Sequence, residues 1–487
     1  SLFAGQEIQE RTAYNSFNYS PVFDEEHRIV GFPEMDGIDG SEINYNALGG
    51  TGKSVSKMSS FFANASYSYL DKYILTGALR YDGSDIIGND NQFTPLWNVG
   101  LRWNLHREEF MKRWMWVDQF AVRGGFGYTG SIDKNALPFV VMTLGQSVIY
   151  DGQTVPTSFS YPNPNVKWQT KQDMNVGLDL SLFDYRLELG VNYYNNITRD
   201  VLDRKALPYS SGRSEVTENV ADIYNSGWEI DLGVTLLKNK SFQWYAKANI
   251  AINDNKVKNT YYKDTEDLPR ATLSNAHQFV ENQPVNGWYG YKFAGINPIN
   301  GAVMTYTGNG EATLDMSVSG ATWPTPSVFY LGNLTPPVVG GFSTSANWKQ
   351  LIFSANFEFK TGHKIKSFNT FRSLDARNRH TSEANRWREP GDITNVPAMS
   401  EAFTTYSSYM YDILLEKGNY LRCSYMTLGY NLKPEWLHKI GFSTARLSFT
   451  AKNLFTISSY SGIDPALMGS FGYPNSRKYT ITLNVGF

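Results

Sequence analysis

The sequence predicts an all-β protein, a transmembrane antiparallel β-barrel to which this chain contributes about 14 strands. Apolar and polar residues alternate in segments of roughly nine to fourteen residues. Short and long connections alternate between these segments, and aromatic residues make up 15% of the chain. A strand of about 9–11 residues can cross a bilayer, whereas strands of soluble proteins average about 5–6 residues. The length of the segments therefore favours a membrane barrel over a soluble sandwich.

The predicted strands follow one another along the whole chain. In order they cover 57–70, 72–83, 95–104, 119–130, 167–181, 184–197, 221–237, 242–254, 287–296, 338–347, 350–361, 420–432, 444–454 and 477–487. Residues 1–15 could form a further strand, and 105–116 and 374–388 could hold short helices. The polar faces carry Lys, Arg, Glu and Asn at mid-strand, which fits a barrel whose wide lumen is wet.

The last segment has the clearest alternation. Tyr479, Ile481, Leu483, Val485 and Phe487 fall on one face, and polar residues and glycine fall on the other. A final strand of this kind that ends on an aromatic residue is typical of bacterial outer-membrane barrels. We interpret these five residues as a barrel assembly signal, and the alternative is an ordinary final strand.

The connections are sorted by length. Short turns occur at 70–71, 183–184, 237–241 and 348–350. Long polar or Gly/Pro-rich stretches cover 24–56, 131–166, 198–220, 254–286, 297–337, 362–418 and 456–476. Short turns at one end and long loops at the other are the asymmetry of an outer-membrane barrel. No composition shift marks a domain boundary.

Composition excludes several other classes of protein. The formal net charge of −2 gives no basic surface for nucleic acid. A mean hydropathy of −0.38 without a run of 18 apolar residues argues against membrane helices. The single cysteine, Cys423, permits neither an intrachain disulfide nor a cysteine zinc site. Because the chain starts at Ser1 without a leader-like segment, we expect it to begin within a longer protein.

No motif predicts catalysis or a bound cofactor. Gly125 to Gly130 matches the dinucleotide pattern G-x-G-x-x-G, but a loop with Pro138 follows where a helix is required. The six histidines show no metal-ligand spacing, and no G-x-S-x-G nucleophile motif occurs. We therefore expect neither an enzyme nor a metal site.

Aromatic residues in the predicted outer loops are the candidate substrate contacts. Trp323, Tyr330 and Trp387 lie in long loops, where aromatic faces can stack on sugar rings or hold peptide side chains. The alternative is that these rings form a membrane-interface belt or the core of the loops.

Several stretches carry a resemblance to a known family. Residues 61–84 read FFANASYSYLDKYILTGALRYDGS, and 123–130 read RGGFGYTG. Further along come YLRCSYMTLGYNL at 420–432, TARLSFTAKNLF at 444–455, GIDPAL at 462–467 and YPNSRKYTITLNVGF at 473–487. In this order, over 57–487, they resemble the barrel of SusC-like TonB-dependent transporters of Bacteroidota. Departures at Asp85, Ser131 and Ala466 bear only on subfamily.

The resemblance implies the C-terminal part of a plugged barrel of about 22 strands in the bacterial outer membrane. Residues 1–487 would be barrel wall with long extracellular loops, and the plug and N-terminal extension would lie outside this chain. It implies active import of an oligosaccharide, or of an oligopeptide, with a SusD-like surface lipoprotein as lid. TonB–ExbB–ExbD would supply energy through the N-terminal part, and two transporter–lipoprotein pairs could form a dimer.

Three alternatives remain open from the residues themselves. A passive porin or outer-membrane binding barrel would have the same strands but no plug. A barrel hydrolase would need a cluster of catalytic residues near the rim. A secreted propeller would show a repeat of about 40–50 residues with short, even loops.

Overall fold

The computed structural model describes the strands of one large sheet and part of the long loops that connect them. It describes residues 1–18, 22–23, 29–31, 49–85, 87, 92–131, 141–150, 153–160, 167–207, 210, 215–261, 263–265, 279–314, 327–367, 384–398, 411–437, 441–468 and 472–487.

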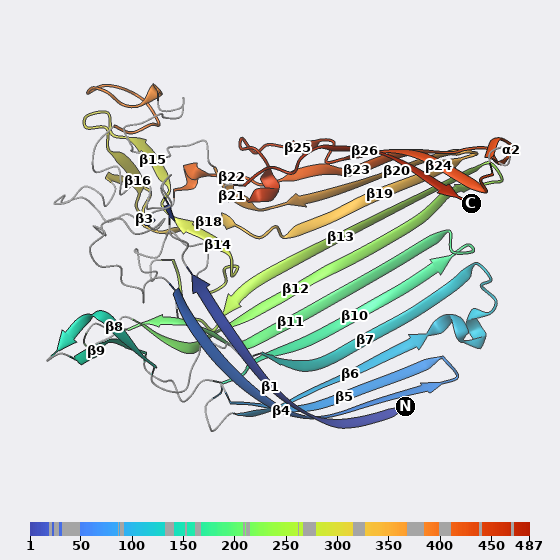
Figure 1. Ribbon diagram of the computed structural model, residues 1–487, viewed down its shortest axis with the longest axis horizontal. Helices are drawn as coiled ribbons and strands as arrows, with labels where there is room; N and C mark the ends of the chain where they lie inside the picture. Colours follow the sequence, from blue (N-terminus) through green and yellow to red (C-terminus); the bar gives the residue numbers. More distant parts are fainter. Residues whose placement is uncertain are drawn as a thin grey trace.

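One antiparallel sheet of fifteen strands forms the body of the molecule. Its hydrogen-bonded order is β1-β4-β5-β6-β7-β10-β11-β12-β13-β19-β20-β23-β24-β26, and β25 also pairs with β23. The strands are β1 Leu2–Asn18, β4 Gly49–Tyr69, β5 Tyr73–Ser84, β6 Phe93–Asn104, β7 Val117–Ser131, β10 Gln169–Leu182, β11 Leu187–Ala206, β12 Glu215–Lys238, β13 Phe242–Lys258, β19 Val338–Trp348, β20 Leu351–Thr361, β23 Tyr420–Asn431, β24 Thr444–Lys452, β25 Thr456–Ser458 and β26 Lys478–Gly486. The sheet curves into an open trough with β1 and β26 at its two ends (Figure 1).

The predicted wall is confirmed except at one segment. Residues 1–15 form a wall strand, whereas 287–296 do not. They hold two short strands of the outer loops, β14 Gly287–Gly290 and β15 Phe293–Ile296, which pair with β18 Phe329–Asn333 and β16 Val303–Tyr306. All four residues of β14 are buried, so this segment lacks the two unlike faces of a wall strand.

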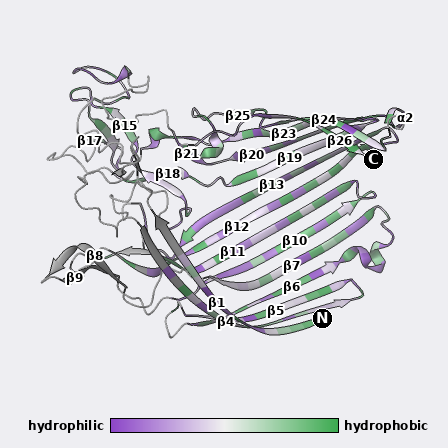
Figure 2. Cartoon of the chain, in the orientation of Figure 1, coloured by the Kyte–Doolittle hydropathy of each residue, from purple (hydrophilic) through white to green (hydrophobic). Residues whose placement is uncertain are grey.

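The two faces of the wall differ as the alternation predicts. Apolar side chains of β24 and β26 are exposed on one face, where Phe449 pairs with Ile481 and Leu447 with Leu483. The intervening residues, such as Ser448 and Thr482, face the other way. Hydropathy changes in stripes along most of the wall strands (Figure 2). The apolar face is the lipid side of a membrane sheet, and the concave polar face is the lumen side.

The short turns and both chain termini lie at the same end of the trough (Figure 1). Several turns use left-handed backbone without glycine, as at Leu70 and Asp71 with φ of 52° and 53° and at Lys349 with φ of 53°. Left-handed residues give a two-residue hairpin the twist of its strands. A longer excursion joins β6 to β7 and holds the 3₁₀ turns η3 Leu105–Arg107 and η4 Glu109–Met111, which confirms short helical structure there.

Smaller sheets occupy the other end, with the long loops. They include β8 Val141–Tyr150 with β9 Gln153–Ser160, β2 Val22–Phe23 with β3 Ile29–Gly31, β21 Lys364–Lys366 with β22 Leu415–Lys417, and β17 Ala312–Leu314 beside β16. The expected helix at 374–388 falls largely outside the described residues. At the short-turn end, α2 spans Pro434–Leu437. None of the helices in the described ranges has the length and apolar character needed to cross a bilayer.

We expect Gly127→Ala to destabilise the wall by about 1–3 kcal/mol, the cost of overpacking. A Cβ at Gly127 would lie 2.5 Å from the backbone oxygen of Trp97 and 2.7 Å from Cα of Asn98, so β6 and β7 would have to separate. Urea unfolding of the full-length protein in lipid vesicles measures the change. Gly77→Ala is the control, since its Cβ would meet only the backbone oxygen of Asn98 at 3.9 Å. Equal effects would contradict the packing argument.

Candidate substrate path

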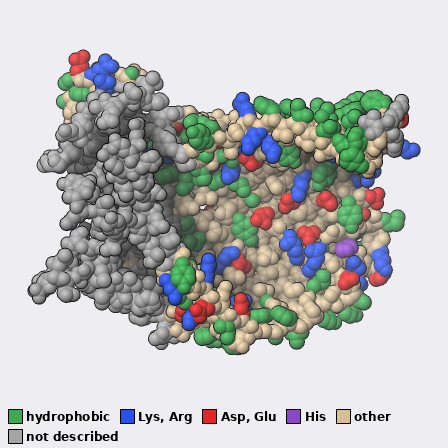
Figure 3. Space-filling view, viewed as in Figure 1, with side chains coloured by type: hydrophobic (Ala, Val, Ile, Leu, Met, Phe, Trp, Pro, Cys, Tyr) green, Lys and Arg blue, Asp and Glu red, His purple; other side chains and the backbone are tan. Residues whose placement is uncertain are grey.

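The lumen face of the wall carries charges of both signs, joined across strands (Figure 3). Asp179 on β10 accepts from Arg102 of β6 at 2.9 Å, and Arg123 of β7 lies 3.5 Å from the same carboxylate. Arg123 also donates to the side chain of Asn192 on β11 at 2.6 Å. These groups are partly exposed to the lumen, so each pair contributes little stability but fixes the direction of its side chains.

A packed layer of outer loops stands at the long-loop end of the wall. Its core contains Tyr289, Tyr291, Val303, Val328 and Tyr411, all buried. Residues far apart in sequence meet here, since Tyr291 and Tyr411 form a β-bridge and the backbone N–H of Phe293 donates to Asp412 at 2.9 Å. Burial raises the pKa of the Tyr289 hydroxyl far above its usual value. The layer is therefore a folded platform that can hold side chains in fixed positions.

A pocket of about 540 Å³ lies between this platform and the loop ends of β12 and β13. Its most distinctive lining is a set of six asparagines: Asn225, Asn253, Asn255, Asn282, Asn286 and Asn333. Asn225, Asn253 and Asn255 have the lumen-facing parity of their strands, and Thr335, Pro336 and Pro337 also line the pocket. A volume of this size is in the range of small-ligand sites.

Hydrogen bonds within the protein hold the asparagines in place. The Asn255 side chain donates to Asn225 Oδ1 at 2.7 Å and accepts from the backbone N–H of Val285 at 2.7 Å. Tyr194 donates its hydroxyl to Asn253 Oδ1 at 2.8 Å. Among the described residues, the side-chain NH₂ groups of Asn225 and Asn253 have no protein acceptor, so they are available to a ligand. An amide lining offers both donors and acceptors without net charge, which suits hydroxyl and peptide groups.

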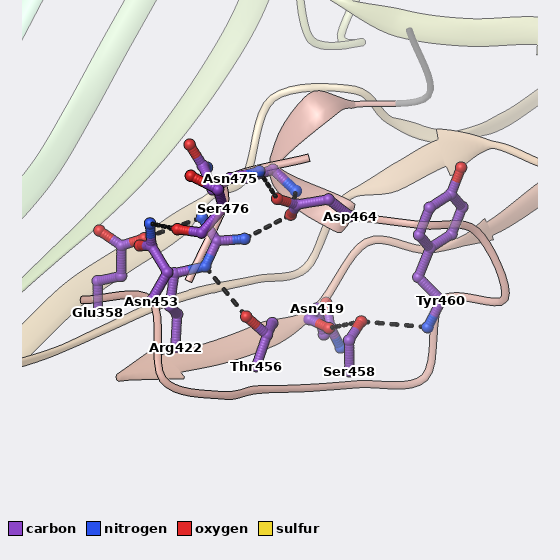
Figure 4. A network of polar contacts seen from close by, with 11 residues as sticks. Glu358, Asn419, Arg422, Asn453, Thr456, Ser458, Tyr460, Asp464, Asn475 and Ser476 are labelled. Carbon is purple, nitrogen blue, oxygen red and sulfur yellow. Dashed lines mark hydrogen bonds and ion pairs between the residues drawn. The ribbon is translucent and has the colours of Figure 1, made fainter. Parts of the chain in front are cut away.

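A buried ion pair fixes the last outer loop against the lumen face of the wall. Arg422 of β23 donates to Asp464, and their side chains are only 5% and 7% exposed (Figure 4). Arg422 also donates from Nε to Thr456 Oγ1 at 3.1 Å, and Asp464 accepts from the backbone N–H groups of Ala466 at 2.9 Å and Asn475 at 3.3 Å. Asp464, which lies between β25 and β26, is thus attached to the lumen face of β23.

The loop aromatics have different surroundings. Tyr330 lines the pocket, its hydroxyl donates to Asn333 Oδ1 at 3.0 Å, and its ring packs near Tyr289. Trp387 packs against the platform core and donates its indole N–H to the backbone oxygen of Pro298 at 3.1 Å. Trp323 lies outside the described residues. Substrate contact by these three residues stays a prediction, and the pocket favours Tyr330 among them.

The remaining motifs have structural positions. Gly125 to Gly130 lie inside β7, where glycine permits close approach of β6, so this segment has no place for a dinucleotide. In the part of the chain that the structure describes, no three His, Cys, Asp or Glu residues come together as metal ligands. Tyr479, Ile481, Leu483 and Val485 share the exposed face of β26, with Phe487 just beyond it, and their assembly role stays a prediction.

Sequence reasoning did not identify the asparagine pocket or the Arg422–Asp464 pair. The run Asn253-Asp254-Asn255 at the loop end of a strand was a visible signal, since two of its residues share one face. No local signal joins Arg422 to Asp464, because the pair spans 42 residues.

The family model and the curated relatives that match this chain all belong to one family. The family model described as TonB dependent receptor-like, beta-barrel matches residues 2–454. The chain is 29% identical over 465 residues to TonB-dependent receptor P3 of Formosa agariphila, covering 88% of this chain and 45% of that protein. It is 23% identical over 453 residues to TonB-dependent receptor SusC of Bacteroides thetaiotaomicron, covering 88% and 43%.

The fold is also found in solved structures. The structure of the RagAB peptide importer in the open-open state gives a TM-score of 0.79 at 24% identity, covering all of this chain and 52% of that one. At this identity the likeness establishes the fold alone. The chain spans about half the length of the curated relatives it matches.

Proposed function

This chain belongs to the TonB-dependent receptor β-barrel family of the bacterial outer membrane, and from that membership we propose that it forms wall and mouth of an active nutrient importer. The cargo would be an oligosaccharide or, as the second candidate, an oligopeptide. The observation that carries this proposal is the pocket of about 540 Å³ lined by six asparagines. Family membership likewise supports a receptor and transporter rather than an enzyme.

Neutral amides select neutral polar cargo. Sugar hydroxyls and peptide groups both donate and accept hydrogen bonds, as amide side chains do. Tyr330 and the prolines beside the pocket add apolar surface for ring faces or side chains. An anionic or cationic cargo would instead need a surplus of fixed charge, whereas Asp254 and Lys256 in the lining pair with each other at 2.7 Å.

The family resemblance also supports a proposal for the parts of the transporter that lie outside this chain. We propose that further strands of the protein pair with the outer edges of β1 and β26, because unpaired backbone is not tolerated in lipid. A plug would fill the lumen, TonB–ExbB–ExbD would remodel it, and a SusD-like surface lipoprotein would close over the loops. A dimer of such pairs is part of the same proposal.

The test is purification of the full-length receptor from its outer membrane, with mass spectrometry of the proteins and small molecules that remain bound. The eluted cargo is then titrated against the receptor and its Asn253→Ala variant. Loss of one neutral hydrogen bond should lower the affinity about three- to tenfold. Asn249→Ala, on the same face of β13 but outside the pocket, is the control and should bind unchanged.

The competing function is a passive porin or binding barrel. Uptake of the eluted cargo is measured in cells with and without TonB. Uptake that persists without TonB would support the porin and overturn active import. A glycan and a peptide eluate distinguish the two cargo classes directly.

A further inference from the structure

The connection between β6 and β7 differs from the other connections at the short-turn end. Turns such as 70–71 and 349 reverse the chain within a few residues, whereas 105–116 forms an excursion with two 3₁₀ turns. Its place among the short turns puts it at the periplasmic side of an outer-membrane barrel. It is visible as the coiled segment beside β6 in Figure 1.

The excursion is held firmly against the outer side of the wall. Glu108 accepts hydrogen bonds from Tyr73 at 2.7 Å, from Lys72 at 3.0 Å and from the Trp103 indole at 3.1 Å. Tyr73 and Trp103 are register partners whose side chains stand on the lipid-facing side with Leu75 and Leu101. The hydrogen bonds from Tyr73, Lys72 and Trp103 lower the pKa of Glu108 to about 2, so this carboxylate stays charged at any physiological pH.

A second attachment ties the far end of the excursion to the next hairpin. The backbone N–H of Phe183 donates to the backbone oxygen of Trp116 at 2.9 Å. The ring of Trp116 stacks on Phe183, with centroids 5.7 Å apart, and Trp114 stacks beside Trp116 at 6.4 Å. The segment is therefore a fixed ledge with a defined outer surface.

That outer surface is strongly apolar. Met115 is 90% exposed, and Phe110, Trp114 and Trp116 are each about half exposed. It continues into exposed aromatic residues of the neighbouring turns, such as Phe183 and Tyr185. Trp and Tyr rings gather where acyl chains meet headgroups, because one part of each ring is apolar and another is polar.

The ledge also carries one surplus positive charge. Lys72 is paired with Glu108, Lys112 with Glu109 at 2.7 Å, and Arg107 lies 3.6 Å from Asp71. Arg113 is exposed beside Trp114, and no carboxylate in the described part of the chain pairs with it. A guanidinium at the edge of an apolar interfacial surface is well suited to a phosphate group.

We propose that 105–116 is a lipid anchor: Phe110, Trp114, Met115 and Trp116 enter the periplasmic leaflet, and Arg113 binds the phosphate of an anionic phospholipid. We assign a lipid rather than a soluble protein as the binding partner of this segment. The segment is attached through Glu108 to lipid-facing Tyr73 and Trp103, and its apolar surface continues into the exposed aromatic residues of the neighbouring turns. The anchor would fix the depth of this side of the wall in the membrane.

The depth is tested in the full-length receptor carrying Met115→Cys with a nitroxide label, reconstituted in phosphatidylcholine vesicles with about one-fifth phosphatidylglycerol. The native thiol of this chain, Cys423, is buried and is not expected to react. A label in the leaflet is relaxed more by oxygen than by an aqueous nickel complex. A label relaxed mainly by nickel would overturn the proposal and point to a soluble partner.

The lipid preference is tested separately by native mass spectrometry of retained phosphatidylglycerol and phosphatidylcholine. Arg113→Gln should lower the preference for phosphatidylglycerol about fivefold, the contribution of one cation near an anionic surface. Arg113→Lys should restore part of it. The matched control is Lys240→Gln, which removes one exposed charge from the β12–β13 turn and should have little effect. Equal losses in the Gln variants, or no loss in either, would overturn the assignment.

Discussion

Arg422→Met is expected to release the last outer loop, at a local cost of about 3–5 kcal/mol. The substitution leaves the buried Asp464 carboxylate without its cation and removes the bond to Thr456. Hydrogen exchange of the full-length receptor should then show faster exchange over 456–477, while the body of β24 stays protected.

Two further variants separate the buried pair from a general effect of losing an arginine. Arg446→Met removes an exposed lumen-facing arginine of β24, which donates to Asn431 Oδ1 at 2.7 Å, and should cost less than about 1 kcal/mol. In Arg422→Met/Asp464→Asn the single amide oxygen can still accept from the backbone N–H of Ala466, and no buried charge is left. Protection should partly return. If the double variant exchanges as fast as the single one, the unpaired charge is not the cause.

Phe449→Arg is expected to destabilise the protein in a bilayer by about 2–4 kcal/mol, the cost of a cation at mid-membrane on a barrel's lipid face. Phe449 stands at the middle of β24 on the apolar face, exposed beside Ile481 and stacked on Tyr479. Urea unfolding in lipid vesicles gives the free energy, and the fraction that reaches the outer membrane gives the cellular effect.

The matched control is Ser448→Arg, one residue away on the lumen face of the same strand. Its neighbours Arg446 and Thr450 are already polar, so a further cation can stay hydrated and should change stability by less than about 1 kcal/mol. If both arginine variants are equally destabilising, the two faces of the wall have been assigned wrongly.

The residue pattern was enough to predict the wall strands, since each carries its own signal. Period-2 alternation reports two unlike surroundings for any strand, and β13, β20, β24 and β26 were assigned correctly from it. The short turns could also be predicted, because the residues that end one strand and begin the next are close together in the sequence. The same rule was wrong at 287–296, where apolar and aromatic residues pack into a buried loop core instead of facing lipid.

Sequence by itself determined the class of fold, the two faces of the wall, the family resemblance and the absence of a catalytic motif. Those properties depend on residues close together in the chain. Only the tertiary structure decided which loop residues meet, as in the asparagine pocket, the Arg422–Asp464 pair and the ledge that Glu108 fastens to the wall. Contacts between distant loops depend on how the whole sheet curves and on which buried polar groups find partners, and no local pattern encodes either.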